Sequence, residues 1–136
     1  MIKVQSTIKA PIEKIWQLWT SPEHITQWNN ASEDWFTPYA ENDLEIGGRF
    51  KFTMASKDGA MSFDFEGMYT DVINYSFIAY KLEDGRKINV SFEPQKKGVI
   101  ITEKFDPETE NTEVLQQQGW QAILDNFKKY AENTVV

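Results

Sequence analysis

One acidic residue of the sequence occupies a position where its carboxyl group could do chemistry. In the segment VIITEKF, residues 99–105, apolar side chains recur at every second position, and Glu103 shares their parity. Alternate side chains of a strand point to one face, so this pattern draws the Glu103 carboxyl inward. A buried carboxylate must be paired or have a raised pKa, and it can anchor a ligand hydroxyl or amine. The alternative is that Glu103 lies near the strand end and is solvated.

The other titratable residues provide no catalytic constellation. His24 is the sole histidine and the chain has no cysteine, which excludes a histidine triad, a multi-histidine metal site and thiol chemistry. Neither a phosphate-binding loop nor a G-x-S-x-G elbow occurs. Asp64 and Glu66 share a strand face that we expect to be solvated. We therefore assign no catalytic residues, no metal ligands and no cofactor.

Large apolar side chains alternate along two further segments. GRFKFTM, ending at Met54, and MSFDFEG, starting at Met61, each predict a strand with one aromatic face. If both faces point inward, they oppose the last helix across a space that is either packed core or a cavity. An apolar lining fits either alternative, because cavities that bind ligands are also mostly apolar. We expect the opening of this cavity to lie beneath Trp28, Trp35 and the loop between them. The candidate cavity residues are Trp28, Trp35, Phe50, Phe52, Phe63, Phe65, Glu103, Trp120, Leu124 and Phe127.

Two short helices are expected after an opening strand. Residues 1–10 alternate apolar with polar side chains, which is typical of a half-buried strand. After Pro11 the apolar spacing changes to i, i+3, i+4, i+7, which indicates a short amphipathic helix. SPEHITQW predicts a second short helix, with its serine as the N-cap.

A meander and a long helix complete the chain. Between residues 47 and 105, strand-like segments are separated by turn signals such as the Asp-Gly dipeptides at 58–59 and 84–85, which predicts four or more antiparallel strands. Residues 112–133 predict a helix with one apolar face. The fold class is α+β: one domain, 1–136, in which a curved antiparallel sheet wraps around a long C-terminal helix.

Gly119 interrupts the apolar stripe of that last helix. A glycine in a helix interior costs roughly 1 kcal/mol relative to alanine. Close approach of another backbone segment would explain its presence next to Trp120. The alternative is a fraying point in the first turns of the helix.

Composition excludes several classes of partner. The 14 basic and 21 acidic residues give a net charge of −7, which disfavours contact with nucleic acid and with anionic membranes. The chain shows no apolar leader and no long apolar run, so we expect a cytoplasmic protein without membrane partners.

Four segments in this order resemble one known family. APIEKIWQLWTSPEHITQW, GGRFKF, FEGMYTDVI and GWQAILDNFKKYAE are similar to signatures of the SRPBCC or START-like superfamily, in the branch of the heat shock protein 90 ATPase activator homologues. The resemblance implies the helix-grip fold, in which many members hold a hydrophobic small molecule. WNNASEDWF departs from the tryptophan pair with glycine and proline that members often carry. The matching residues are Gly47, Gly48, Phe50, Phe65, Gly67, Tyr69, Gly119 and Trp120.

Three functions follow from these observations. The first is a binding protein for a hydrophobic or amphipathic small molecule held between the sheet and the last helix. The second is a protein-interaction domain that, like the cochaperone that names the branch, stimulates a chaperone ATPase. An enzyme acting on a hydrophobic substrate is the third, although no residue pattern singles out its acid or base.

Overall fold

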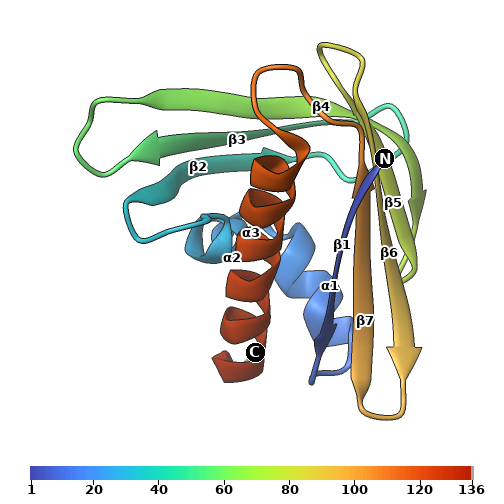
Figure 1. Cartoon of the computed structure of the whole chain (residues 1–136). Coiled ribbons are helices and arrows are strands. Elements are labelled where there is room, and N and C mark those ends of the chain that lie inside the picture. Colours follow the sequence, from blue (N-terminus) through green and yellow to red (C-terminus); the bar gives the residue numbers. More distant parts are fainter. Residues whose placement is uncertain (136) are drawn as a thin grey trace.

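The sheet of the protein curves around one long helix. In the computed structural model, which describes residues 1–135, seven antiparallel strands follow the order β1-β7-β6-β5-β4-β3-β2, and α3 crosses their concave face (Figure 1). The predicted α+β helix-grip architecture is thereby confirmed. In chain order the elements are β1 (Ile2–Ile8), α1 (Ile12–Thr20), α2 (Pro22–Trp28), β2 (Trp35–Asn42), β3 (Arg49–Ser56), β4 (Ser62–Ile73), β5 (Phe77–Leu82), β6 (Lys87–Gln95), β7 (Gly98–Phe105) and α3 (Glu113–Asn133).

One strand falls outside the predicted meander, which began at residue 47. β2 pairs with β3 at the edge of the sheet although it contains Pro38, which has no backbone donor. The pairing register shifts between Phe36 and Tyr39, on either side of the proline. Proline is tolerated at a sheet edge and at such irregularities, so a segment with weak strand signals still pairs.

The two Asp-Gly turns form where the sequence predicts them. Gly59 and Gly85 have φ angles of 78° and 93°, in the left-handed region that side chains disfavour. Each joins two consecutive strands, β3 to β4 and β5 to β6. The meander is therefore set by short-range turn chemistry.

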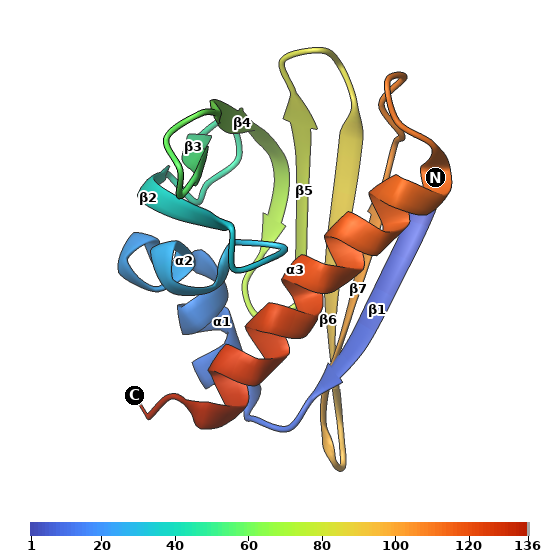
Figure 2. The same cartoon turned by 60° about the vertical axis from the view of Figure 1, so that its left-hand side comes forward.

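The two short helices close one end of the space that the sheet encloses. α2 lies beside β2, and both short helices contact each other and α3 (Figure 2). Between them, the indole Nε1 of Trp28 donates to the carbonyl of Leu18 at 2.9 Å. The Phe127 ring packs against both Trp19 and Trp28, with ring centroids 4.8 Å apart in each pair. This end is packed core.

α3 has two halves with different surroundings. Its second half is anchored in the core by Leu124, Phe127 and Ala131, each with no exposed surface. Its first half starts at the N-cap Thr112, whose hydroxyl accepts from the backbone of Leu115 at 3.2 Å. Among the described residues, no helix combines the length and the apolar character needed to cross a bilayer.

Candidate ligand-binding cavity

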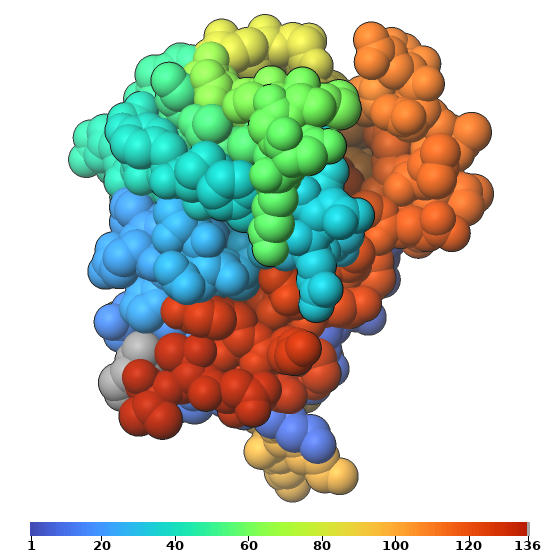
Figure 3. All heavy atoms as spheres, turned by 90° about the vertical axis from the view of Figure 1, so that its left-hand side faces the viewer, coloured from blue at the N-terminus to red at the C-terminus, as the bar shows by residue number. Residues whose placement is uncertain are grey.

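A cavity of about 340 Å³ lies between the first half of α3 and the concave face of the sheet. Figure 3 shows the face of the molecule on which the β3–β4 hairpin and the start of α3 lie on either side of a recess. The volume suits a small ligand, since ligand pockets start at roughly 300 Å³. The lining residues are Trp19, Thr20, Trp28, Asn29, Ala31, Asn42, Phe50, Phe52, Met54, Phe63, Phe65, Tyr69, Ile78, Tyr80, Arg86, Glu103, Gln116, Gly119, Trp120 and Ile123.

Aromatic rings hold one another in place along the cavity wall. Phe50 contacts Phe52 and Tyr80, with ring centroids 5.1 and 4.8 Å apart. Phe65 meets Trp120 of α3 edge to face at 6.1 Å. Tilted and edge-to-face pairs at these distances are favourable, so the wall keeps its shape without a ligand.

Gly119 faces this cavity, and nothing approaches it closely. A Cβ added at this position would meet no atom within 4 Å, so the predicted close backbone approach is wrong. The fraying alternative is also wrong, because α3 is continuous from Glu113 to Asn133. The missing side chain leaves volume open at the point where any larger residue would project into the cavity.

Glu103 is buried among apolar neighbours and faces the cavity. It is 5% exposed, and its register partners are Val4 on β1 and Val90 on β6. Burial removes water from the carboxyl group and raises its pKa from 4.5 to about 8. The Glu103 carboxyl makes no hydrogen bond within residues 1–135. Every side-chain oxygen of these residues that is fully enclosed does have a hydrogen-bond partner, so the Glu103 carboxyl is not fully enclosed, and its small accessible surface faces the cavity that it lines.

Tyr80 lines the same end of the cavity, and no other described residue hydrogen-bonds to its hydroxyl. Burial raises the pKa of its phenol well above the usual value, and the neighbouring Glu103 carboxyl raises it further. The Arg86 guanidinium acts in the opposite direction on the same pKa, and its Nε donates to an Asp84 carboxylate oxygen at 2.8 Å. Tyr80 therefore keeps its proton at neutral pH.

The other polar side chains at the wall are engaged within the protein. The Tyr69 hydroxyl donates to Asn42, whose amide nitrogen donates to the carbonyl of Thr20 at 2.8 Å. The Gln116 side chain accepts from the backbone nitrogen of Glu108 at 2.9 Å and donates to the carbonyls of Glu108 and Asn111. These bonds fasten β4 to α1 and the β7–α3 loop to the helix. They leave little capacity for a ligand.

The structure brings seven of the ten candidate residues together. Trp28, Phe50, Phe52, Phe63, Phe65, Glu103 and Trp120 line the cavity, whereas Trp35, Leu124 and Phe127 are not among its lining residues. Leu124 and Phe127 are absent from the lining because α3 crosses the sheet so that its second half faces the core. Trp35 is absent because it packs on Phe63 at the rim, with ring centroids 5.9 Å apart. Met61, expected on the inner face, is 62% exposed in the hairpin.

Several lining residues were missed by the sequence reasoning. Tyr80 could have been found, since Ile78, Tyr80 and Leu82 alternate on one face of β5. Arg86, Asn42 and Gln116 lie at element ends or in polar segments, where no local pattern indicates their direction. His24 does not line the cavity, and its ring nitrogen Nδ1 forms a hydrogen bond of 2.8 Å with the Tyr130 hydroxyl.

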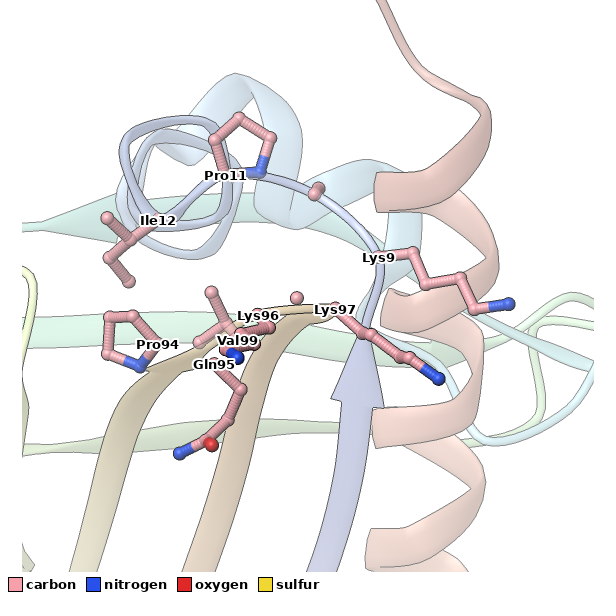
Figure 4. Close-up of a pocket in the computed structure, with 10 residues that line it drawn as sticks. Lys9, Pro11, Ile12, Pro94, Gln95, Lys96, Lys97 and Val99 are labelled. Carbon is pink, nitrogen blue, oxygen red and sulfur yellow. The ribbon is translucent and has the colours of Figure 1, made fainter.

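A second, open groove lies at the far end of the β6–β7 hairpin. It has a volume of about 560 Å³ and runs between Lys9–Ile12 and Pro94–Val99. Figure 4 shows Ile12 and Pro94 near each other, while the amino groups of Lys9 and Lys97 lie away from them. Its lining includes no acidic side chain, no histidine and no hydroxyl or thiol group, and its three lysines have no acid or base partner in the lining, so it carries no evident chemistry. Among the described residues, no cluster of three or more potential metal ligands occurs.

Solved structures with the same fold include close sequence relatives. An AHSA1-like protein from Aeromonas hydrophila is 44% identical over 96% of this chain and 91% of its own, with a TM-score of 0.91. A protein from Cytophaga hutchinsonii is 50% identical over 97% of this chain and 92% of its own, with a TM-score of 0.84. A protein from Chromobacterium violaceum shares 18% identity over 98% of both chains, with a TM-score of 0.86, which shows the fold alone. A search of curated proteins found no match.

The fold and the cavity together define the class of protein. It is a helix-grip domain of the START-like superfamily with an aromatic cavity between its sheet and its last helix. The family model described as Activator of Hsp90 ATPase homolog 1-like protein matches residues 9–132. The chain belongs to this family, which confirms the resemblance found in the sequence.

Proposed function

We propose that the protein binds a small hydrophobic or amphipathic molecule in the cavity between α3 and the sheet. The observation that carries this proposal is the open space beside Gly119, where an added Cβ would touch nothing. Leaving such space in a helix interior costs roughly 1 kcal/mol of helix propensity. A packed core would instead use that volume, because protein interiors are close-packed.

The aromatic wall supports the same function. Phe50, Phe65 and Trp120 present ring faces and edges to a space with few free polar groups. Ligand sites are mostly apolar, with a small number of polar groups that orient the ligand. Such a wall accepts flat or compact apolar molecules and rejects strongly hydrated ones.

Quenching of tryptophan fluorescence by 1-bromoadamantane, an apolar probe that does not absorb with indole, tests the proposal. Trp19, Trp28 and Trp120 line the cavity, so bound bromine should quench part of the emission in a saturable manner. A micromolar dissociation constant would correspond to a binding free energy of about −8 kcal/mol. Absence of saturable quenching by this probe and by a panel of apolar ring compounds would contradict the proposal.

Two variants of α3 make the test specific. Gly119→Leu places a side chain in the empty volume and should abolish saturable quenching. Gln118→Leu is the matched control, since Gln118 is exposed and does not line the cavity. Both replacements introduce the same strong helix former, so they should leave the helix intact. Equal loss of binding in both variants would show that the cavity is not the site.

The family description supports a second candidate function, contact with a chaperone ATPase. If this is the function, the surface that contacts the chaperone lies outside the cavity. Addition of the protein to a purified chaperone of the heat shock protein 90 class would then raise its ATP turnover. Gly119→Leu, which fills an internal space, should not affect that stimulation.

A further inference from the structure

The free polar groups of the cavity gather at one end. Glu103 and Tyr80 are the lining residues whose carboxyl and hydroxyl groups face the space without a hydrogen-bond partner among residues 1–135. Arg86 lies at the same end, where it acts electrostatically on Tyr80. The rest of the wall is aliphatic or aromatic, or has its side-chain amide and hydroxyl groups engaged within the protein. A ligand in this cavity therefore meets one apolar region and one polar end.

The register of the sheet explains why Tyr80 and Glu103 converge. Tyr80 pairs with Ile88 on β6, and Glu103 pairs with Val90 on the same strand. Ile88 and Val90 are two residues apart and therefore point to the same face. Tyr80 and Glu103 thus reach into the concave space from β5 and β7, on opposite sides of β6. Their positions are set by three paired strands, so they are held before any ligand enters.

All three groups carry hydrogen-bond donors at neutral pH. With a pKa of about 8, the Glu103 carboxyl is predominantly protonated at pH 7 and carries an O–H donor. The Tyr80 phenol is also protonated, and the guanidinium of Arg86 has donors only. The titratable or charged groups in the cavity wall are Tyr69, Tyr80, Arg86 and Glu103, and Tyr69 is engaged with Asn42. The Asp84 carboxylate, which pairs with Arg86 Nε at 2.8 Å, lies outside the lining, so an acceptor atom of a ligand would meet donors and no anionic side chain in the cavity wall.

We infer that Glu103, Tyr80 and Arg86 form an anchoring site for a carbonyl-type oxygen, so that the ligand is a compact apolar ring compound with such an oxygen at one end. This inference rests on the proposed binding function and adds the chemical class of the ligand. Neutral donors in an apolar site favour an acceptor because leaving a buried donor unpaired has a cost that an acceptor oxygen removes. A protonated carboxyl beside a tyrosine hydroxyl is a known arrangement for holding a carbonyl or enolate oxygen in other proteins.

Three naphthalene probes of similar size test the anchoring site by calorimetry at pH 7. 2-Acetylnaphthalene carries a carbonyl oxygen, 2-ethylnaphthalene lacks a polar group, and 2-(aminomethyl)naphthalene carries a cation. We expect 2-acetylnaphthalene to bind about tenfold more tightly than 2-ethylnaphthalene, the ratio that one or two hydrogen bonds provide. The cationic probe should bind most weakly of the three, because its ammonium group would lose hydration in an apolar cavity whose only carboxyl is predominantly protonated at pH 7.

Variants assign the preference to the named groups. Glu103→Leu and Tyr80→Phe should each reduce the tenfold ratio to about threefold or less, since each removes one donor. Glu103→Gln keeps a neutral donor and should retain the preference for 2-acetylnaphthalene. Above pH 8 the ratio should fall in the wild type, where Glu103 ionises, and stay constant in Glu103→Gln. Thermal melts confirm that each variant is folded before it is titrated.

The outcomes separate this inference from the function on which it rests. If 2-acetylnaphthalene and 2-ethylnaphthalene bind equally well, the anchoring site is refuted while the apolar binding function stands. If 2-(aminomethyl)naphthalene binds most tightly and Glu103→Gln loses that affinity, the carboxyl acts as an anion and the inference is refuted. If no probe binds in the wild type, the proposed function itself fails.

Discussion

Trp120 of α3 lies flat on Phe105 of β7, with ring centroids 3.9 Å apart and ring planes at 11°. This stack joins the first half of the helix to the end of β7, the strand next to the edge strand β1. Trp120 also borders the cavity, so its indole is at once a structural contact and part of the wall. The stability of the fold and the shape of the cavity are therefore coupled through one side chain.

Trp120→Ala should cost about 2 kcal/mol of unfolding free energy, because only part of its surface is packed on core atoms. Phe127→Ala, at a fully buried position of the same helix, should cost about 3–5 kcal/mol. Urea denaturation of the two variants measures the difference. An equal loss would mean that the space beside Trp120 is filled in solution.

Gly119→Ala should stabilise the protein by about 0.5–1 kcal/mol. The added methyl group meets no atom within 4 Å, and alanine restores the lost helix propensity. Thermal and chemical unfolding measure the effect. A destabilised variant would show that another segment approaches this glycine closely, contrary to the structure.

Glu103 should make stability depend on pH between about 4.5 and 8. Over this interval the unfolded chain loses the proton of this carboxyl while the folded protein keeps it, so stability falls as pH rises. The slope should approach about 1.4 kcal/mol per pH unit. Denaturation of the wild type and of Glu103→Gln across this range measures it.

The difference between these two proteins isolates the Glu103 contribution. Glu103→Gln should gain stability relative to the wild type as pH rises, with no such gain below pH 4.5, where both folded and unfolded carboxyls are protonated. Exposed carboxyls such as Asp58 and Glu108, whose pKa values hydrogen bonds lower, are common to both proteins and cancel. A difference that does not change with pH would contradict burial of the Glu103 carboxyl.

Phe65→Ala should alter the affinity for an apolar ligand far more than Asp64→Ala. Phe65 lines the cavity, whereas Asp64 is exposed on the other face of β4, where it accepts from the Thr53 hydroxyl at 2.7 Å. Losing one aromatic wall should weaken binding by about 1–2 kcal/mol. Titration with 1-bromoadamantane compares the two variants. Equal effects would place the ligand outside the cavity.

The Tyr69–Asn42 hydrogen bond should contribute to stability through α1. Asn42→Ala breaks the bonds to Tyr69 and to the carbonyl of Thr20, so it should cost about 2–3 kcal/mol. Tyr69→Phe should cost about 1 kcal/mol, because it removes one bond and leaves the ring in place. A double-mutant cycle measured by urea denaturation gives the coupling between them. Additive effects would show that the bond is absent in solution.

Local sequence patterns predicted most of the secondary structure. The opening strand, the helix after Pro11, the meander with its turns at Gly59 and Gly85, and the long last helix each depend on residues near one another in the chain. β2 was missed because Pro38 weakens its strand pattern, and only pairing with β3 makes it a strand. Edge pairing of this kind depends on a partner, which a local pattern does not reveal.

The sequence by itself determined which faces of the strands are apolar and that Glu103 shares one of them, because side-chain direction alternates along any strand. Only the tertiary structure decided that the space behind these faces is open. That outcome depends on the angle at which α3 crosses the sheet, which sends Leu124 and Phe127 into the core and leaves Gly119 over empty volume. It also depends on three strands bringing Tyr80 and Glu103 to one end of the cavity. Such relations join residues distant in the chain, so no local pattern specifies them.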